Sequence, residues 1–197
     1  MNLNDLQLDA LREMSNIGSG NAATALASML GQSVDLRVPT ALALELADAV
    51  DAVGNAEDSV NAVIIGVFGD LDATVLLLFD PESASTLCAL LGVQGDPEME
   101  LSALGEIGNI LGSSYVQAMG SMTGLHMEPN PPIAMADMLG AIVASVLAVT
   151  AADTDLALLL DSRMTVDSTA CNFGFLFVPG GEGVAVLLDR LGLGEAA

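Results

Sequence analysis

The strongest constraint on the fold of this chain is an internal repeat. When residues 8–50 are laid over residues 101–143, an offset of 93 positions, 15 of the 43 aligned residues are identical. Even a chain as rich in Ala and Leu as this one should give only a few such matches by chance. We therefore expect a single pseudo-twofold domain over residues 1–197, made of two repeats at about 1–95 and about 96–197.

Each repeat predicts the same succession of secondary structure. A long helix comes first, and an extended stretch with a proline, a shorter helix, two strands and a closing helix follow. In the first repeat we expect a helix at about 4–30, an extended stretch at 34–46, strands at 60–68 and 73–79, and a closing helix from Pro81. In the second repeat we expect a helix at about 98–124, an extended stretch at 127–136, a shorter helix at 137–149, strands at 156–164 and 173–178, and a closing helix from Gly181. Gly69-Asp70, between two apolar runs, indicates a hairpin. Residues 94–98 read as a turn and a helix start rather than a linker, so we expect the repeats to share one core.

Both long helices have an apolar or small-residue face that we expect to pack on the core. Its members are Leu8, Leu11, Met14, Ser15, Gly18, Ala22, Ala25, Leu26 and Met29, and then Leu101, Leu104, Ile107, Gly108, Leu111, Tyr115, Ala118, Met119 and Met122. The opposite faces carry polar triads, which are Asp9, Glu13 and Asn16 in the first helix and Ser102, Glu106 and Asn109 in the second. The fold expected is α/β of the α+β kind, with two long exposed helices packed on a mainly antiparallel sheet.

The repeated Glu and Asn indicate a required surface rather than an ordinary solvated helix face. Asn is a poor residue for a helix interior, yet this face keeps it twice while most other positions differ. A carboxylate can pair with a Lys or Arg of a partner, and a carboxamide can hold one water in a fixed orientation. Such a pair suits the positioning of a water in a partner's site rather than covalent catalysis.

Gly20 lies on the same face as the first triad, where a missing side chain would let a partner's backbone approach closely. A phosphate-binding turn at residues 18–20 is disfavoured, because this segment follows no strand and opens no helix. The second repeat does not keep the glycines at the same positions, so part of the glycine content is expected to serve packing between the long helices.

Other kinds of site have weaker support. Asp9 and Glu13 are suitable ligands for a hard cation, but a convex helix lacks the enclosing ligands that such a site needs, and we expect no metal. Cys88 and Cys171 form no disulfide or metal-binding pattern and are expected to be reduced core residues. His126 is the single histidine of the chain, and we expect it in a strand or loop.

The charge of the chain limits its partners and its environment. It has 26 Asp and Glu against 4 basic residues, for a net charge of -22, which disfavours nucleic acids and anionic membranes. Such repulsion is largely screened in molar salt, so we expect a very salty cytoplasm, that of an extreme halophile.

The apolar run at 138–152 is shorter than the roughly 18 residues of a membrane helix and is expected to be a buried helix. The N-terminus lacks a signal-peptide pattern.

The repeated motif resembles a known signature. Both copies fit (Asp or Ser)-x3-Glu-x2-Asn-x22-Pro, with the proline at Pro39 and Pro132, which is similar to the two motifs of the CheC family of chemotaxis phosphatases. The resemblance covers essentially the whole chain and places it in the CheC/CheX/FliY superfamily, although single-site CheX is a poorer match. It implies a compact α/β fold and hydrolysis of the phospho-aspartate of the response regulator CheY.

The resemblance also implies a role for each motif residue. Glu13 and Glu106 would each anchor a lysine of the bound regulator, and Asn16 and Asn109 would align the attacking water. The remaining positions would support docking or structure, with Asp9 and Ser102 at the variable first position and Pro39 and Pro132 setting the strand after each helix. The regulator would supply the Mg²⁺, so no cofactor is expected on this chain.

A second partner and a second function follow from the same resemblance. The receptor deamidase CheD would dock near Asp137 to Val149. Switch-complex relatives use this fold mainly for binding, so the alternative is a non-catalytic protein that sequesters phosphorylated CheY or regulates CheD. The intact Glu/Asn pairs favour catalysis.

Overall fold

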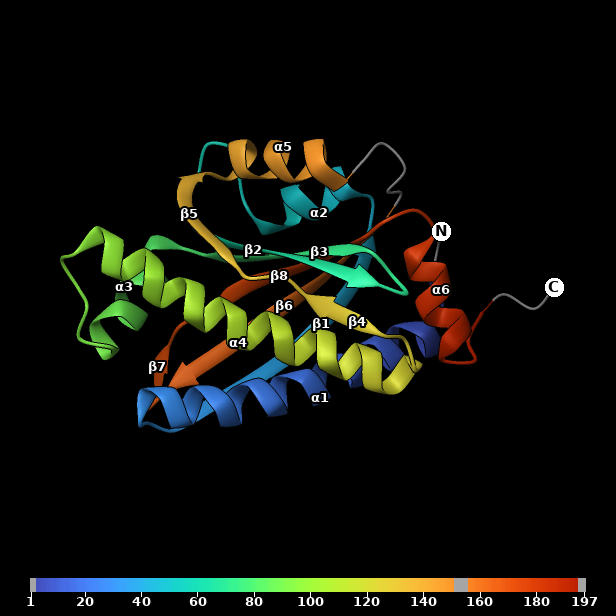
Figure 1. Ribbon diagram of the computed structural model, residues 1–197, viewed down its shortest axis with the longest axis horizontal. Coiled ribbons are helices and arrows are strands. Elements are labelled where there is room, and N and C mark those ends of the chain that lie inside the picture. The colour runs from blue at the N-terminus through green and yellow to red at the C-terminus, as the bar shows by residue number, and fades with distance from the viewer. Residues whose placement is uncertain (1–2, 151–155, 195–197) are drawn as a thin grey trace.

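The computed structural model describes residues 3–150 and 156–194 and shows a layered α/β fold (Figure 1). The helices are α1 (Asp5–Leu30), α2 (Leu46–Val53), α3 (Pro81–Leu90), α4 (Pro97–Thr123), α5 (Leu139–Thr150) and α6 (Gly183–Arg190). The strands are β1 (Val34–Leu44), β2 (Ser59–Gly69), β3 (Ala73–Phe79), β4 (Met127–Pro129), β5 (Ile133–Met138), β6 (Ala157–Val166), β7 (Thr169–Ala170) and β8 (Phe173–Pro179).

The strands form one sheet in the order β1-β6-β8-β3-β2-β4, with β5 also paired to β2 and β7 to β6. Each of these pairings is antiparallel. The hairpin predicted at Gly69-Asp70 joins β2 to β3. The expected α/β fold with a mainly antiparallel sheet is therefore confirmed.

The two long helices begin and end where local sequence signals place them. The side chain of Asp96 caps the N-terminus of α4, because it accepts hydrogen bonds from the backbone N–H groups of Glu98 and Met99. Gly31 and Gly124, just past the C-termini, have φ values of 66° and 70°, a conformation that glycine adopts without strain. Both predicted ranges are therefore correct to within one residue at each end.

The edge strand of the second half differs from its prediction. The single stretch expected at 127–136 is split into β4 and β5, because Pro131 and Pro132 between them have no amide hydrogen to donate to the sheet. Both pieces pair with the same edge of β2. Asp137 and Met138 pair with β2 as well, so α5 begins at Leu139 rather than at Asp137 as predicted.

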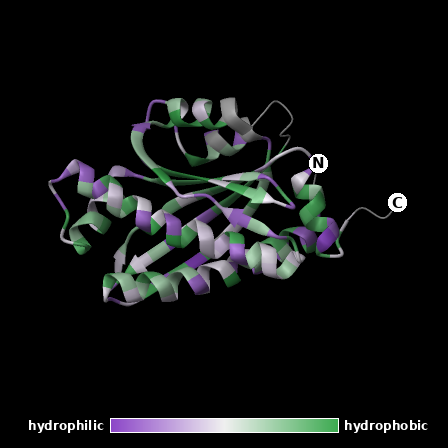
Figure 2. Cartoon of the chain, in the orientation of Figure 1, coloured by the Kyte–Doolittle hydropathy of each residue, from purple (hydrophilic) through white to green (hydrophobic). Residues whose placement is uncertain are grey.

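The core lies on both faces of the sheet. One cluster of buried side chains fills the space between the sheet and α1, α3, α4 and α6, and a smaller one lies under α2 and α5. Figure 2 accordingly shows hydrophobic strands in the middle of the molecule and helices of mixed polarity around them. Cys88 and Cys171 are buried and free, as predicted.

The predicted core face of the long helices is largely correct. Leu11, Met14, Ala22 and Leu26 are buried, whereas Ala25 is exposed although its counterpart in α4 is buried. The predicted members nearest the helix ends are half-buried, namely Leu8, Met29, Leu101 and Met122. α5 buries one side on the sheet through residues such as Leu139 and Ile142. The last two residues of the apolar run predicted at 138–152 lie outside the described residues.

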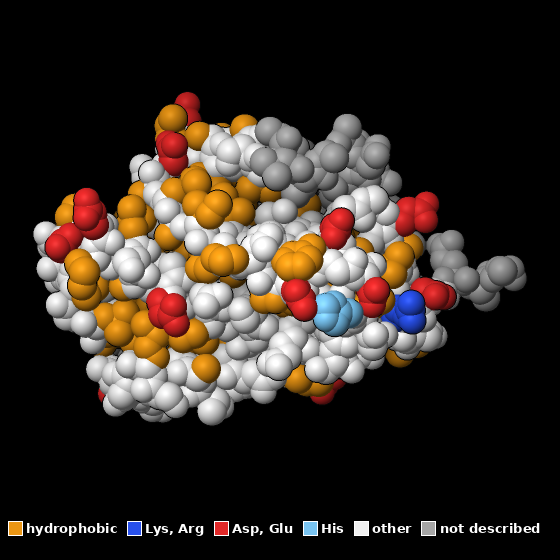
Figure 3. Space-filling model, in the orientation of Figure 1, with side chains coloured by type: hydrophobic (Ala, Val, Ile, Leu, Met, Phe, Trp, Pro, Cys, Tyr) orange, Lys and Arg blue, Asp and Glu red, His pale blue; other side chains and the backbone are white. Residues whose placement is uncertain are grey.

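Acidic side chains are scattered over the face of the molecule seen in Figure 3, interspersed with small hydrophobic areas. Across the described ranges, no helix is both long enough and apolar enough to cross a bilayer.

Candidate functional site

The two polar triads lie on neighbouring helices. α1 and α4 run antiparallel, side by side, on one face of the sheet (Figure 1). The contact between them is close at Gly18, where an added Cβ would lie 3.0 Å from the Cα of Tyr115. The hydroxyls of Ser19 and Tyr115 share a hydrogen bond of 2.8 Å across the same contact. This packing fixes the two helices relative to one another, so that their outward faces form a rigid surface.

Tyr115 lies at the centre of this contact and is fully buried. Its ring packs on Phe175 with centroids 4.4 Å apart, which ties the helix pair to the sheet. Burial raises the pKa of the Tyr115 hydroxyl above its ordinary value, against the smaller effect of its hydrogen bond to Ser19. Tyr115 is therefore a neutral structural group at neutral pH.

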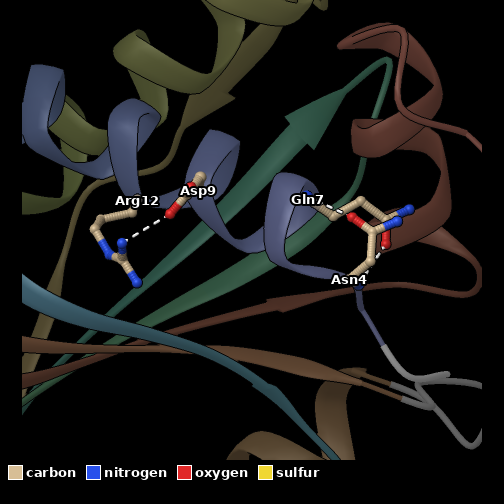
Figure 4. Close-up of polar contacts among 4 residues, drawn as sticks. All are labelled: Asn4, Gln7, Asp9 and Arg12. Atoms are coloured by element: carbon tan, nitrogen blue, oxygen red, sulfur yellow. Dashed lines mark hydrogen bonds and ion pairs between the residues drawn. The ribbon is translucent and has the colours of Figure 1, made fainter.

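The first triad is exposed on α1, as predicted for Asp9, Glu13 and Asn16. The Asp9 carboxylate accepts a hydrogen bond of 2.8 Å from Nη1 of Arg12, one turn along the helix. Figure 4 shows this pair beside the start of α1, where Asn4 and Gln7 each accept the other's backbone N–H. This reciprocal capping holds the first turn in place, so the triad begins on an ordered helix.

The second triad on α4 is less uniformly exposed than predicted. Ser102 and Glu106 are exposed, but Asn109 is half-buried. Its side-chain oxygen lies 3.4 Å from the hydroxyl of Ser113, a long hydrogen bond within the helix. The oxygen accepts from Ser113, and the NH₂ group of Asn109 has no hydrogen bond of its own among the described residues, so it remains able to donate.

The glutamates of the two triads are available for a partner. Within the described part of the chain, neither Glu13 nor Glu106 has a hydrogen bond or ion pair of its own. Each is therefore a solvated carboxylate that can pair with a cation from another molecule, at little cost in internal contacts.

Gly20 and the two prolines complete the predicted set. An added Cβ at Gly20 would have no heavy atom within 4 Å, so this position is open to solvent. Pro39 lies in β1 where the register with β6 shifts between Arg37 and Thr40. That irregularity suits a residue without an N–H on an edge strand. Pro132 instead precedes β5 and lines a hollow beside Glu106.

No three His, Cys, Asp or Glu side chains of residues 3–150 and 156–194 are grouped closely enough to hold a metal ion. His126 lies in the loop before β4, as predicted, and its Nε2 is 3.3 Å from the Glu128 carboxylate. That contact joins the loop to β4, and among the described residues neither His126 nor Glu128 has a hydrogen bond or ion pair to either triad.

Comparison with known proteins places these features in a family. A model of the CheC-like family matches residues 6–42 and 99–139, two segments that contain the two copies of the motif. The chain is 34% identical over 145 residues to the CheY-P phosphatase CheC of Bacillus subtilis, an alignment that spans 70% of this chain and 69% of that protein. The chain belongs to the CheC-like family.

Solved structures agree with this CheC-like fold. The crystal structure of Thermotoga maritima FliY superposes with a TM-score of 0.78 at 18% identity, over 98% of each chain. CheX in a CheX-CheY-BeF3-Mg²⁺ complex from Borrelia burgdorferi gives a TM-score of 0.51 at 16% identity, over 83% of this chain and 96% of that one. At these identities the structures show a shared fold.

Two residues of the CheC-like surface were missed by the sequence analysis. Arg12 pairs with Asp9, and Ser113 contacts Asn109. Both stand at positions where the repeats differ, because Arg12 aligns with Gly105 and Ser113 with Gly20. A search for identities between the repeats passes over such positions, although the i,i+3 and i,i+4 spacings to the triads are visible in the sequence.

Proposed function

We propose that this protein hydrolyses the phospho-aspartate of the response regulator CheY. The observation that supports it most is the pair of outward-facing Glu-x2-Asn motifs on two closely packed helices, with both glutamates and Asn16 exposed and Asn109 half-buried, in a chain 34% identical to a CheY-P phosphatase. The phosphatase it resembles comes from Bacillus subtilis, and we propose that the motif residues of this chain carry the same activity.

In the proposed mechanism, Glu13 or Glu106 pairs with a lysine of the docked regulator and fixes the helix over its phosphorylated aspartate. The side chain of Asn16 or Asn109 then hydrogen-bonds a water and holds it in line with the P–O bond to the aspartyl group. The water oxygen bonds to phosphorus as that bond breaks, so the products are inorganic phosphate and a free aspartate. Mg²⁺ on the regulator would neutralise charge on the transferring group.

The alternative is a protein that binds phosphorylated CheY without accelerating its loss of phosphate, or that acts by binding CheD. A CheD-binding surface at α5 fits the sequence resemblance, and α5 lies on the opposite face of the sheet from α1 and α4 (Figure 1). Docking there would leave both motif faces open, so the two partners need not compete.

The working environment that we propose is a cytoplasm with molar salt, as in extreme halophiles. A net charge of -22 on 197 residues opposes compaction in dilute buffer, and salt screens that repulsion. The same screening removes long-range steering of CheY, so recognition would depend on the short-range contacts of the motif faces.

The test is the decay of phosphorylated CheY in concentrated KCl. The wild type should accelerate decay, Asn16→Ala and Asn109→Ala should each retain part of the acceleration, and the double variant should lose roughly a hundredfold or more while still binding the regulator. Gln117→Ala, an exposed change on α4 outside the motif, is the control. A wild type that binds phosphorylated CheY but leaves its decay rate unchanged would establish the binding-protein alternative.

A further inference from the structure

The two motif faces differ at a position next to the motif Glu that the shared signature does not include. In α1 this position holds Arg12, and in α4 it holds Gly105. Arg12 is 43% exposed, its Nη1 is bonded to Asp9, and its Nε is shielded from solvent without a partner among the described residues. The side chain is therefore held along the helix surface rather than extended into water.

At the second face the corresponding space is open. A hollow of about 350 Å³ lies between α4 and the start of β5, and it is lined by Leu101, Ser102, Gly105, Glu106, Pro132 and Ala134. Gly105 forms part of its wall, since an added Cβ there would already lie 3.5 Å from the Cβ of Ala134. The hollow has an apolar side, from Leu101, Pro132 and Ala134, and a carboxylate at its rim.

We propose that the second face is the tighter docking site for the regulator and that Arg12 weakens the first. This inference rests on the proposed function, which supplies a lysine as the group to be bound. The hollow beside Glu106 receives the aliphatic part of that lysine while its ammonium pairs with the carboxylate, an arrangement that suits a long amphipathic side chain. At the first face an arginine stands in place of Gly105, directly before Glu13 in the chain, and its positive charge would oppose the approach of a lysine.

The surroundings of the two asparagines also favour tighter docking at the second face. Asn109 is half-buried and its oxygen is engaged by Ser113, so its amide is oriented before the partner arrives. Asn16 is exposed and has Gly20 at the corresponding position, so its side chain has no such support. Binding at the first face must therefore order one more side chain, which lowers affinity.

The experiment isolates each face in the full-length protein and separates KM from kcat. Glu106→Lys blocks the second face and Glu13→Lys blocks the first, and each is assayed for decay of phosphorylated CheY in concentrated KCl. The first face alone should show a KM roughly fivefold above that of the second face alone. Adding Arg12→Ala to Glu106→Lys should lower that KM to near the value of the second face, with kcat changed less than twofold.

The reciprocal change tests the hollow itself. In the Glu13→Lys background, Gly105→Arg should raise KM by roughly fivefold or more, and Gly105→Met, which fills the hollow without charge, should raise it by less. Arg163→Ala removes one exposed positive charge from β6 and should leave KM unchanged. Equal KM values for the two faces, or no response to Arg12→Ala, would overturn the inference.

Binding distinguishes this inference from the proposed function. If neither the wild type nor any variant accelerates decay, the phosphatase proposal fails. Titration with BeF₃⁻-activated CheY then tests whether the two faces bind the regulator unequally. Tighter binding by Glu13→Lys than by Glu106→Lys, with a gain on adding Arg12→Ala, supports unequal docking sites. Equal dissociation constants refute it.

Discussion

Three glycines of the long helices have different surroundings. An added Cβ would lie 3.0 Å from the Tyr115 backbone at Gly18 and 2.6 Å from Cγ1 of Val63 at Gly108, whereas at Gly20 it would touch nothing. Packing thus accounts for the first two glycines and leaves Gly20 without a reason inside this molecule. Glycine in an exposed helix interior costs about 0.5–1 kcal/mol relative to alanine, so the close approach of a partner's backbone at Gly20 is a prediction to be tested.

Gly20→Ala should therefore separate stability from docking. The variant should unfold at higher temperature, with a gain of about 0.5–1 kcal/mol in the free energy of unfolding, because the new methyl group meets no neighbour. If a partner's backbone approaches at this point, affinity for phosphorylated CheY should fall by roughly threefold or more. Titration and thermal denaturation check the two effects. Ser28→Ala, exposed on the same helix, is the control, and unchanged affinity of Gly20→Ala would remove Gly20 from the docking surface.

At the scale of elements, the order and the ends of most helices and strands followed from local signals. The Asn4 and Asp96 caps, the glycines after α1 and α4, and the Gly69-Asp70 turn all act within a few residues of sequence. The break between β4 and β5 and the late start of α5 did not follow, since both depend on pairing with β2. Similarly, the exposure of the triads was predictable from helical periodicity, but the half-burial of Asn109 was not.

The close approach of α4 to β2 gives a prediction about helix packing. Gly108 lies against Val63, and an added Cβ at Gly112 would lie 2.5 Å from Cδ1 of Ile65. Gly108→Ala should lower the free energy of unfolding by about 1–3 kcal/mol, because the helix or the buried Val63 must move to admit the methyl group. Urea denaturation measures the change, and Gly20→Ala provides the same substitution at an open position. A gain in stability for Gly108→Ala equal to that of Gly20→Ala would show that α4 is not held at this distance.

At the scale of the whole molecule, the strand order mirrors itself about the centre of the sheet. β3 and β8, the last strands of the two halves, pair in the middle with Leu76 opposite Leu176, and β2 and β6 flank them. β1 forms one edge, while β4 and β5 together form the other. This order is the one that a pseudo-twofold domain would have, while the duplication itself remains an inference from the sequence. It puts α1 and α4 on the same side of the sheet and so makes two motif faces possible in one chain.

The net charge of -22 is a property of the whole molecule, and it predicts how stability depends on salt. The Debye length falls from about 30 Å at 0.01 M to about 3 Å at 1 M, so the protein should lose its circular dichroism signal in dilute buffer and regain it in molar KCl. Asp51→Asn, Glu57→Gln and Asp72→Asn together remove three exposed negative charges. This triple variant should fold at lower KCl concentration, whereas Arg163→Gln, which adds to the imbalance, should need more. Both shifts should vanish at high salt, where screening is complete. A wild type equally stable in 10 mM and 2 M KCl, with both variants unchanged, would show that repulsion is already balanced within the fold and would remove the physical basis for a halophilic origin.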